Sequence, residues 1–360
     1  MAAPPPRPRE DALDALRGLA IVGMVLANLQ GSEEHAFPLL VHAVWNGLTI
    51  ADLVFPLFLL CAGLALPLAF DGRTPRPSVA RIVRRSATLY AIGFVIGMIA
   101  HPTMQLAEIR FAGVLARIAI VYLCCALVTR STSGWRVPAV VAVVLLIAHG
   151  ALLYCAPPGG GAGMAPGEGL SGWLDRAVLG GTRLYGKTFD PEGVLSTLSS
   201  IATGMIGVAI ARAILPGRQS VGRLLAIAAT LLVAGIAASR VWPINKALWT
   251  PSFALVNAAI GLTLLGALKG AWSWIGRWAP VRLGTNLGRN ALTLYVVHDM
   301  LTIVMFWRIG ETTSWEMLFT SLANIGLPLD WASLLFAIIV GSVAVAITLA
   351  MQRRGWVIRV

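Results

Sequence analysis

Apolar positions along this chain gather into long runs that short polar segments separate. Ten of these runs are about 20 residues long, the length that an α-helix needs to cross a bilayer. They cover residues 13–30, 50–70, 82–100, 111–129, 137–155, 192–214, 222–241, 250–268, 288–307 and 331–351. The pattern therefore predicts an all-α, polytopic integral membrane protein with about ten transmembrane helices.

The basic residues predict how these spans are oriented, because lysine and arginine collect in cytoplasmic segments. With the N-terminus in the cytoplasm, the inner segments hold 20 of the 28 basic residues and the outer segments hold seven. We therefore expect both termini to be cytoplasmic and residues 31–49 to lie outside. The chain then divides into a tail, 1–12, one transmembrane domain, 13–351, and a second tail, 352–360.

Composition agrees with this class and narrows the partners. The chain is 57% hydrophobic and 12% charged, whereas soluble domains carry roughly 25% charged residues. A net charge of +12 can indicate nucleic-acid binding, but here the positive-inside rule accounts for it. We expect the lipid bilayer, and no nucleic acid, as a partner. The four cysteines lack metal-ligand spacing, so we expect no metal.

The longest predicted outer loop covers residues 156–191. Its first part is rich in glycine and proline, which favours irregular turns. Its second part carries aromatic and charged residues, and this composition favours ordered structure. We expect the loop to form a lid over the outer face; a loose connector is the alternative.

Polar side chains inside the apolar runs are candidates for function, because they are costly to place in a membrane. They are Asn28, Asp52, Arg117, Asn257, Asn290, His298 and Asp299. Arg117 lies near the middle of its span and could pair with Asp299. A structural ion pair between helices and a polar ligand path are both open at this point.

A second polar group precedes the 50–70 span, in the stretch HAVWNGLTIADLVFP that begins at His42. Thr49 and Asp52 fit a capping box, which would give Asp52 a purely structural role. An imidazole beside a carboxylate is also the arrangement of a base and its orienting partner. We therefore take His42 as a candidate catalytic base and leave both interpretations of Asp52 open.

Two further groups of charges lie near the ends of spans. The sequence DPEG, residues 190–193, has the proline and acids of a helix start, and Asp190 with Glu192 could also hold an ammonium group or sugar hydroxyls. Arg84 and Arg85 either enforce topology or bind the phosphates of a cytosolic ligand. The strings GTRLYGKT, residues 181–188, and GEGLSG, residues 167–172, match the bare Walker A and GxGxxG patterns, but the predicted all-α chain places no strand before either, so they do not indicate an ATPase or a nicotinamide enzyme.

Six stretches, in order over roughly residues 11–305, resemble the heparan-α-glucosaminide N-acetyltransferase family and its bacterial relatives. They are DALRGLAIVGMVLANLQG, HAVWNGLTIADLVFP, IRFAGVLARIAIVY, LDRAVLGGTRLYGKTFDPEGVLSTLSSI, WPINKALWTPSF and RNALTLYVVHDM. The second stretch and the DPEG segment are the most specific. The chain is similar to the ten-span core of this family without the N-terminal extension of the animal lysosomal enzyme.

The resemblance implies transfer of an acetyl group from cytosolic acetyl-CoA to the amine of a glucosamine-type sugar on the outer side. It implies His42 and Asn28 as catalytic residues. To the acceptor we assign Trp45, Asn46, Asp52, Asp190, Glu192 and His298. To acetyl-CoA we assign Arg84, Arg85, Arg110, Arg117 and Asn290.

The expected location is a bacterial plasma membrane with the active site open to the outer side, and a homodimer is compatible with the family. Two other functions stay open. One is an O-acetyltransferase that acts on a glycan hydroxyl. The other is a proton-coupled transporter that uses His298, Asp299 and Arg117 as a path. Transporters often contain inverted repeats, and we find no convincing similarity between the two halves of the chain.

Overall fold

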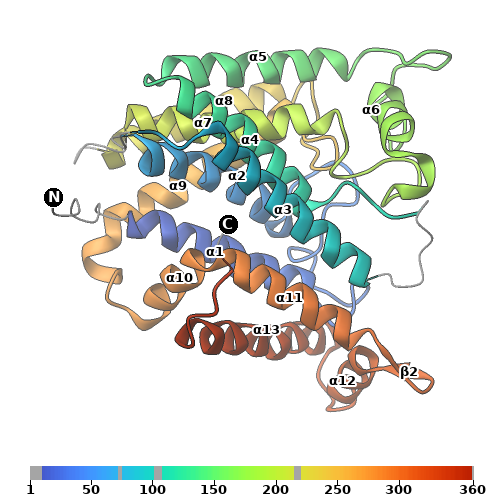
Figure 1. The fold of residues 1–360 in the computed structure, drawn as a ribbon. Helices are drawn as coiled ribbons and strands as arrows, with labels where there is room; N and C mark the ends of the chain where they lie inside the picture. The colour runs from blue at the N-terminus through green and yellow to red at the C-terminus, as the bar shows by residue number, and fades with distance from the viewer. Residues whose placement is uncertain (1–9, 72–74, 101–107, 215–219, 359–360) are drawn as a thin grey trace.

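The computed structural model describes residues 10–71, 75–100, 108–214 and 220–358, and these are mostly helical (Figure 1). The longer helices are α1 (Asp11–Asn28), α2 (Ile50–Phe70), α3 (Val79–Ala100), α4 (Val114–Ser131), α5 (Arg136–Leu152), α7 (Ser196–Ala213), α8 (Ser220–Ala238), α9 (Pro251–Ile275), α10 (Ala279–Arg289), α11 (Ala291–Met305) and α13 (Leu329–Arg353). Shorter elements are α6 (Gly169–Leu174), a π-helical turn (Asp175–Leu179), a 3₁₀ turn (Gly181–Arg183), α12 (Ser314–Ala323) and the strands β1 (Arg308–Ile309) and β2 (Thr312–Thr313).

Six helices in the described part of the chain are long and apolar enough to cross a membrane: α2, α3, α4, α8, α9 and α13. The helices α5 and α11 are apolar but shorter. A polytopic membrane protein is therefore supported. The ten predicted runs all overlap helices, but the crossing by α1, α5, α7 and the α10–α11 pair stays a prediction, as does the position of the termini.

Two predicted spans differ from the structure. The predicted ninth span, 288–307, is interrupted at Asn290, which lies between α10 and α11. Its side-chain amide donates to the carbonyl of Asn286, 2.9 Å away, and such a local bond competes with the helical backbone pattern. The predicted sixth span begins at Ser196 and not at residue 192. DPEG is a turn, closed by the N–H of Gly193 on the carbonyl of Asp190 at 2.9 Å.

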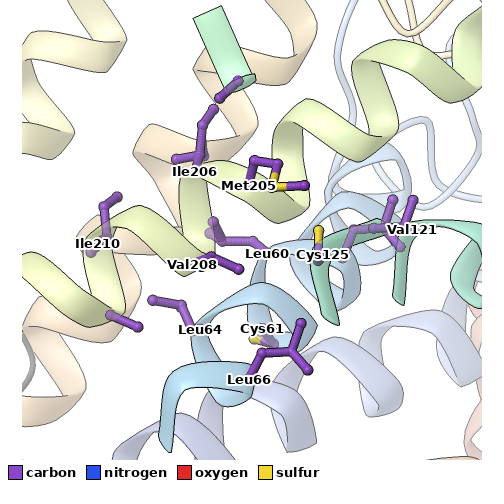
Figure 2. Close-up of a cluster of buried hydrophobic side chains, with 14 of the residues drawn as sticks. Leu60, Cys61, Leu64, Leu66, Val121, Cys125, Met205, Ile206, Val208 and Ile210 are labelled. Atoms are coloured by element: carbon purple, nitrogen blue, oxygen red, sulfur yellow. The ribbon is translucent and has the colours of Figure 1, made fainter. Parts of the chain in front are cut away.

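The centre of the bundle is α2, which packs against α1, α4, α7 and α9. Small residues allow the closest approaches: a Cβ atom on Gly63 would lie 2.0 Å from the carbonyl oxygen of Gly204 in α7. Around this crossing, apolar side chains of α2, α4 and α7 interlock (Figure 2). The labelled members are Leu60, Cys61, Leu64, Leu66, Val121, Cys125, Met205, Ile206, Val208 and Ile210. From this core α2 extends to its first residue, Ile50, and the candidate site begins just before that end.

The two ends of the bundle differ in their polar contacts. At the predicted cytoplasmic end, Asp71 after α2 pairs with Arg76 and Arg212, and Arg212 also binds the carbonyls of Thr129 and Thr132 at the end of α4. At the other end lie α6, α12 and the β1–β2 hairpin (Figure 1). The loops that carry His42 and residues 156–191 also reach that end.

Candidate functional site

His42 lies on the irregular segment before α2, and Asp52 holds it in place. Its Nδ1 atom lies 2.9 Å from Oδ1 of Asp52, and the histidine side chain is half-exposed whereas the aspartate is fully buried. The other oxygen, Oδ2, accepts hydrogen bonds from the N–H of Ala43 and from both the N–H and the hydroxyl of Thr49. The predicted capping box is therefore present. Asp52 both caps α2 and orients the imidazole.

This contact determines which ring nitrogen is available for chemistry. An ionised carboxylate only accepts hydrogen bonds, so Nδ1 of His42 carries the hydrogen that Asp52 accepts. In the neutral imidazole, the lone pair is then on Nε2. A carboxylate at Nδ1 is the geometry of a histidine whose Nε2 acts as a general base.

A residue outside the predicted site completes the group around His42. Lys246, in the loop between α8 and α9, places its Nζ atom 3.0 Å from both ring nitrogens and 3.6 Å from Oδ1 of Asp52. Burial lowers the pKa of Lys246, and the charges of Asp52 and Glu192 oppose that shift. The signal in the sequence was faint: Lys246 is one of only three lysines and lies in the stretch WPINKALWTPSF.

The loop of Lys246 is docked on the loop of His42 by backbone and side-chain bonds. Asn46 and Asn245 form an isolated antiparallel bridge, and the side-chain amide of Asn245 donates to Oδ1 of Asn46 at 3.1 Å. The N–H of Gly47 donates to the carbonyl of Ile244 at 2.8 Å. These bonds hold the two loops against each other without the side chains of Lys246 and His42.

The segment 156–191 is ordered and contacts the segment of His42. The indole N–H of Trp45 donates to the carbonyl of Met164 at 2.8 Å, and its ring meets Phe189 edge-to-face with centroids 5.0 Å apart. A cavity of about 210 Å³ lies between these loops. It is lined by Trp45, Asn46, Met164, Ala165, Pro243, Asn245, Leu248 and Thr250. A lid function for the segment stays a prediction.

Asp190 and Glu192, which we assigned to the acceptor, bind Arg110. Its Nε and Nη2 atoms pair with the two oxygens of Asp190 at 2.7 and 2.5 Å, and Nη2 also lies 2.5 Å from Oε2 of Glu192. Burial works against the charge of Arg110, but the two carboxylates outweigh it and raise the pKa of the guanidinium. The structure thus brings together three predicted site residues, although we had assigned Arg110 to acetyl-CoA.

A buried carboxylate shapes the turn that carries these acids. Asp175, in the π-helical turn, accepts the N–H of Asp190 at 3.1 Å and that of Val194 at 2.8 Å. Gly193 leaves room for it, since a Cβ atom there would lie 2.3 Å from Oδ1 of Asp175. Burial raises the pKa of Asp175, against the effect of the two donors. No feature of the sequence singles out this residue.

Arg117 does not form the ion pair with Asp299 that the sequence left open. Its Nη2 atom donates to the carbonyl of Gly193 at 3.2 Å and to the hydroxyl of Ser196, and its guanidinium lies 5.1 Å from the ring centroid of Trp249. It is buried, and its Nε and Nη1 atoms find no hydrogen-bond partner in the described chain. Arg117 therefore belongs to the floor below the DPEG turn.

On α11, His298 is buried with Nδ1 2.9 Å from Oδ1 of its neighbour Asp299. The contact lacks the geometry of a hydrogen bond, and neither ring nitrogen has a hydrogen-bond partner among the described residues. Tyr295, one turn earlier, lies within electrostatic range of Asp299, Glu192 and Arg110. This part of α11 therefore adjoins the Arg110 cluster.

Comparisons with known proteins show the family of the chain. A family described as "Acyltransferase domain" matches residues 10–351. The chain belongs to this acyltransferase family. It is 27% identical to human heparan-alpha-glucosaminide N-acetyltransferase over an alignment of 371 positions, gaps included, which covers 83% of this chain and 54% of the human protein. With the mouse protein of that name the identity is also 27%, over 375 positions, 84% of this chain and 55% of the mouse chain. The chain thus spans about half the length of these curated relatives.

The remaining predicted site residues do not form a bond with His42, and some of them lie in other parts of the structure. Asn28 is the exposed last residue of α1, and no hydrogen bond joins it to His42 in the described part of the chain. Arg84 and Arg85 are exposed on the first turns of α3, and Arg85 lies 4.7 Å from the ring centroid of Tyr122. Asn290 is at the break between α10 and α11.

Proposed function

We propose that the protein transfers an acetyl group from cytosolic acetyl-CoA to the amine of a glucosamine-type sugar on the outer side of the membrane. The observation that carries the proposal is the pair formed by the half-exposed imidazole of His42 and the buried carboxylate of Asp52, 2.9 Å apart. The acyltransferase family and the resemblance to heparan-alpha-glucosaminide N-acetyltransferases supply the reaction class.

In this reaction His42 is the general base. Its Nε2 atom takes a proton from the acceptor nitrogen while that nitrogen attacks the thioester carbon. The carbon–nitrogen bond forms, the carbon–sulfur bond breaks, and the departing sulfur receives the proton. A positioned base of this kind contributes about 10²–10⁴-fold. A route through an acetyl-histidine is a variant in which Nε2 itself attacks the thioester.

The donor site combines basic residues at one end of the bundle with the base at the other. The exposed guanidinium groups of Arg84 and Arg85 suit the phosphates of CoA. An extended pantetheine arm then has to cross a hydrocarbon core of about 30 Å to reach His42. Asn28, exposed at the end of α1, is our candidate donor to the thioester oxygen as negative charge develops on it.

For the acceptor, we propose the space beside His42 that Trp45 and Asn46 border. Glu192, which binds Arg110, lies close enough for its charge to act on Lys246. An indole face and amide groups are typical partners of a sugar ring, and carboxylates attract the ammonium form of its amine. His298 and Asp190 would then support the acceptor site from α11 and the DPEG turn.

The test is an assay of purified protein in detergent with radiolabelled acetyl-CoA and glucosamine. We expect label on the sugar with wild type and none with His42→Ala. His35→Ala, which removes another histidine from the same irregular segment, is the matched control and should retain full transfer. Equal transfer by wild type and His42→Ala would refute the proposed role of His42.

The same assay separates the alternatives. An O-acetyltransferase would label N-acetylglucosamine, in which the amine is blocked, as well as glucosamine. A transporter would give no labelled sugar with either acceptor. The transporter has less support from the structure than from the sequence, because Arg117 binds Gly193 and Ser196 and does not pair with Asp299.

A further inference from the structure

The position of Lys246 over His42 is unusual for a neighbouring cation. Its Nζ atom is equally close to both ring nitrogens, at 3.0 Å. In the ring plane, a point with those two distances would overlap the Cε1 carbon between them. The ammonium therefore lies over the face of the imidazole, where neither nitrogen lone pair points at it.

The charges around this contact are few and identifiable. Asp52 reaches His42 from α2 at 2.9 Å and Lys246 at 3.6 Å. Glu192 and Arg117 act on Lys246 from the DPEG turn and from α4, with opposite signs. The two carboxylates favour the ammonium form of Lys246, whereas burial and Arg117 oppose it. Asp52 and Lys246 both contact the ring of His42.

These two groups act on the protonation of His42 in opposite directions. A carboxylate at Nδ1 favours the imidazolium form and would, alone, leave His42 protonated to higher pH. A cation over the ring face disfavours the imidazolium, because a second positive charge would lie within about 3 Å of it. The same cation is attracted to the ring electrons of the neutral imidazole.

We propose that Lys246 acts through His42 by holding its imidazole unprotonated, so that Nε2 remains a base at neutral pH beside the buried carboxylate that orients it. This inference deepens the proposed function and rests on it for its catalytic meaning. Asp52 orients the ring but also raises its affinity for a proton. Lys246 lowers that affinity again. The Asn46–Asn245 bridge holds the loop of Lys246 against the loop of His42.

The test uses two readouts on purified protein in detergent. The first is the pH profile of acetyl transfer. The second is independent of transfer: the rate at which diethyl pyrocarbonate modifies His42, followed against pH by peptide mass spectrometry. Only the neutral imidazole reacts, and the half-exposed side chain of His42 is accessible. The midpoint of that curve reports the protonation of His42 directly.

Two neutral variants, Lys246→Met and Lys246→Gln, guard against a folding defect in either. We expect both to move the His42 midpoint to higher pH by about one unit or more. Lys246→Arg keeps the charge and should stay close to wild type. Asp52→Asn removes the opposing charge and should move the midpoint to lower pH. A midpoint that stays within about 0.3 units of wild type in both neutral variants would overturn the inference.

The two readouts also separate this inference from the proposed function. A midpoint that shifts as expected in a protein that transfers no acetyl group would support the electrostatic role and refute the acetyltransferase. Acetyl transfer by wild type with an unchanged midpoint in the variants would support the acetyltransferase and refute the electrostatic role of Lys246. A purely structural role of Lys246 would lower the transfer rate at every pH without moving either profile.

Discussion

At the scale of single residues, Asp52 shows how one carboxylate serves the fold and the site together. Its two oxygens have different partners: Oδ2 binds the helix start at Thr49, and Oδ1 binds His42. The sequence presented capping and catalysis as alternatives. They are compatible because an ionised carboxylate has acceptor capacity for about four hydrogen bonds.

Replacing Asp52 by Asn should therefore affect chemistry more than folding. The amide retains one acceptor oxygen but loses the charge and can present the wrong group to Nδ1 of His42. We expect kcat for acetyl transfer to fall by about 10²–10⁴-fold. The matched control is Asp330→Asn, which removes an acid from the first turn of α13 and should leave kcat within about twofold, the range of a neutral surface change. A kcat for Asp52→Asn equal to that of the control would contradict this role.

Single residues are also where sequence reasoning was least complete. Lys246 is 204 positions from His42, and its contact depends on how two outer loops dock. The role of Asp175 is evident only from the structure, in which it binds two backbone N–H groups. In contrast, the partnership of His42 and Asp52 was predictable because ten positions separate them across one helix start.

At the scale of elements, the DPEG turn depends on Asp175. Substituting Asp175 by Ala would leave the N–H groups of Asp190 and Val194 without their acceptor. We expect a loss of about 1–3 kcal/mol in the free energy of unfolding, the cost of unsatisfied buried donors. Thermal unfolding in detergent measures it, with Val178→Ala, at an exposed position of the same π-helical turn, as the control. Equal melting temperatures for the two variants would show that the turn does not need this carboxylate.

Close helix packing gives a second prediction at this scale. Gly63→Ala would place a Cβ atom 2.0 Å from the carbonyl of Gly204, whereas at Gly97 in α3 the added atom would meet nothing within 4 Å. We expect Gly63→Ala to destabilise the protein by about 1–3 kcal/mol through overpacking. Gly97→Ala should be neutral or stabilising by up to about 1 kcal/mol. Similar unfolding temperatures for both would place the α2–α7 contact in doubt.

The apolar runs predicted the existence of the helices well, because burial and lipid exposure both demand continuous apolar sequence. They predicted ends and breaks less well. Nothing in the hydropathy of 288–307 marks the interruption at Asn290, since a single amide residue between apolar neighbours barely changes a window average. The start of α7 was placed four residues early because Pro191 and Glu192 are typical of a first helical turn, yet Asp175 holds them in a turn outside it.

At the scale of the whole molecule, the topology has a test in the cysteines. Cys155, just after α5, is exposed, whereas Cys61 and Cys125 are buried. A maleimide that cannot cross membranes should label Cys155 on intact cells, because the distribution of basic residues predicts that this loop lies outside. In a Cys155→Ser background, Gly134→Cys at the other end of α5 should react only after permeabilisation. The reverse pattern would invert the predicted orientation and, with it, the side of the active site.

The central claim is that one His42-centred site joins a donor from one side of the membrane to an acceptor on the other. The most direct measurement uses sealed proteoliposomes with radiolabelled acetyl-CoA inside and glucosamine outside. We predict labelled N-acetylglucosamine in the outer medium with wild type, and none with His42→Ala or when donor and acceptor are both supplied outside. Product formed only with both substrates on the same side, or formed equally by His42→Ala, would contradict the account.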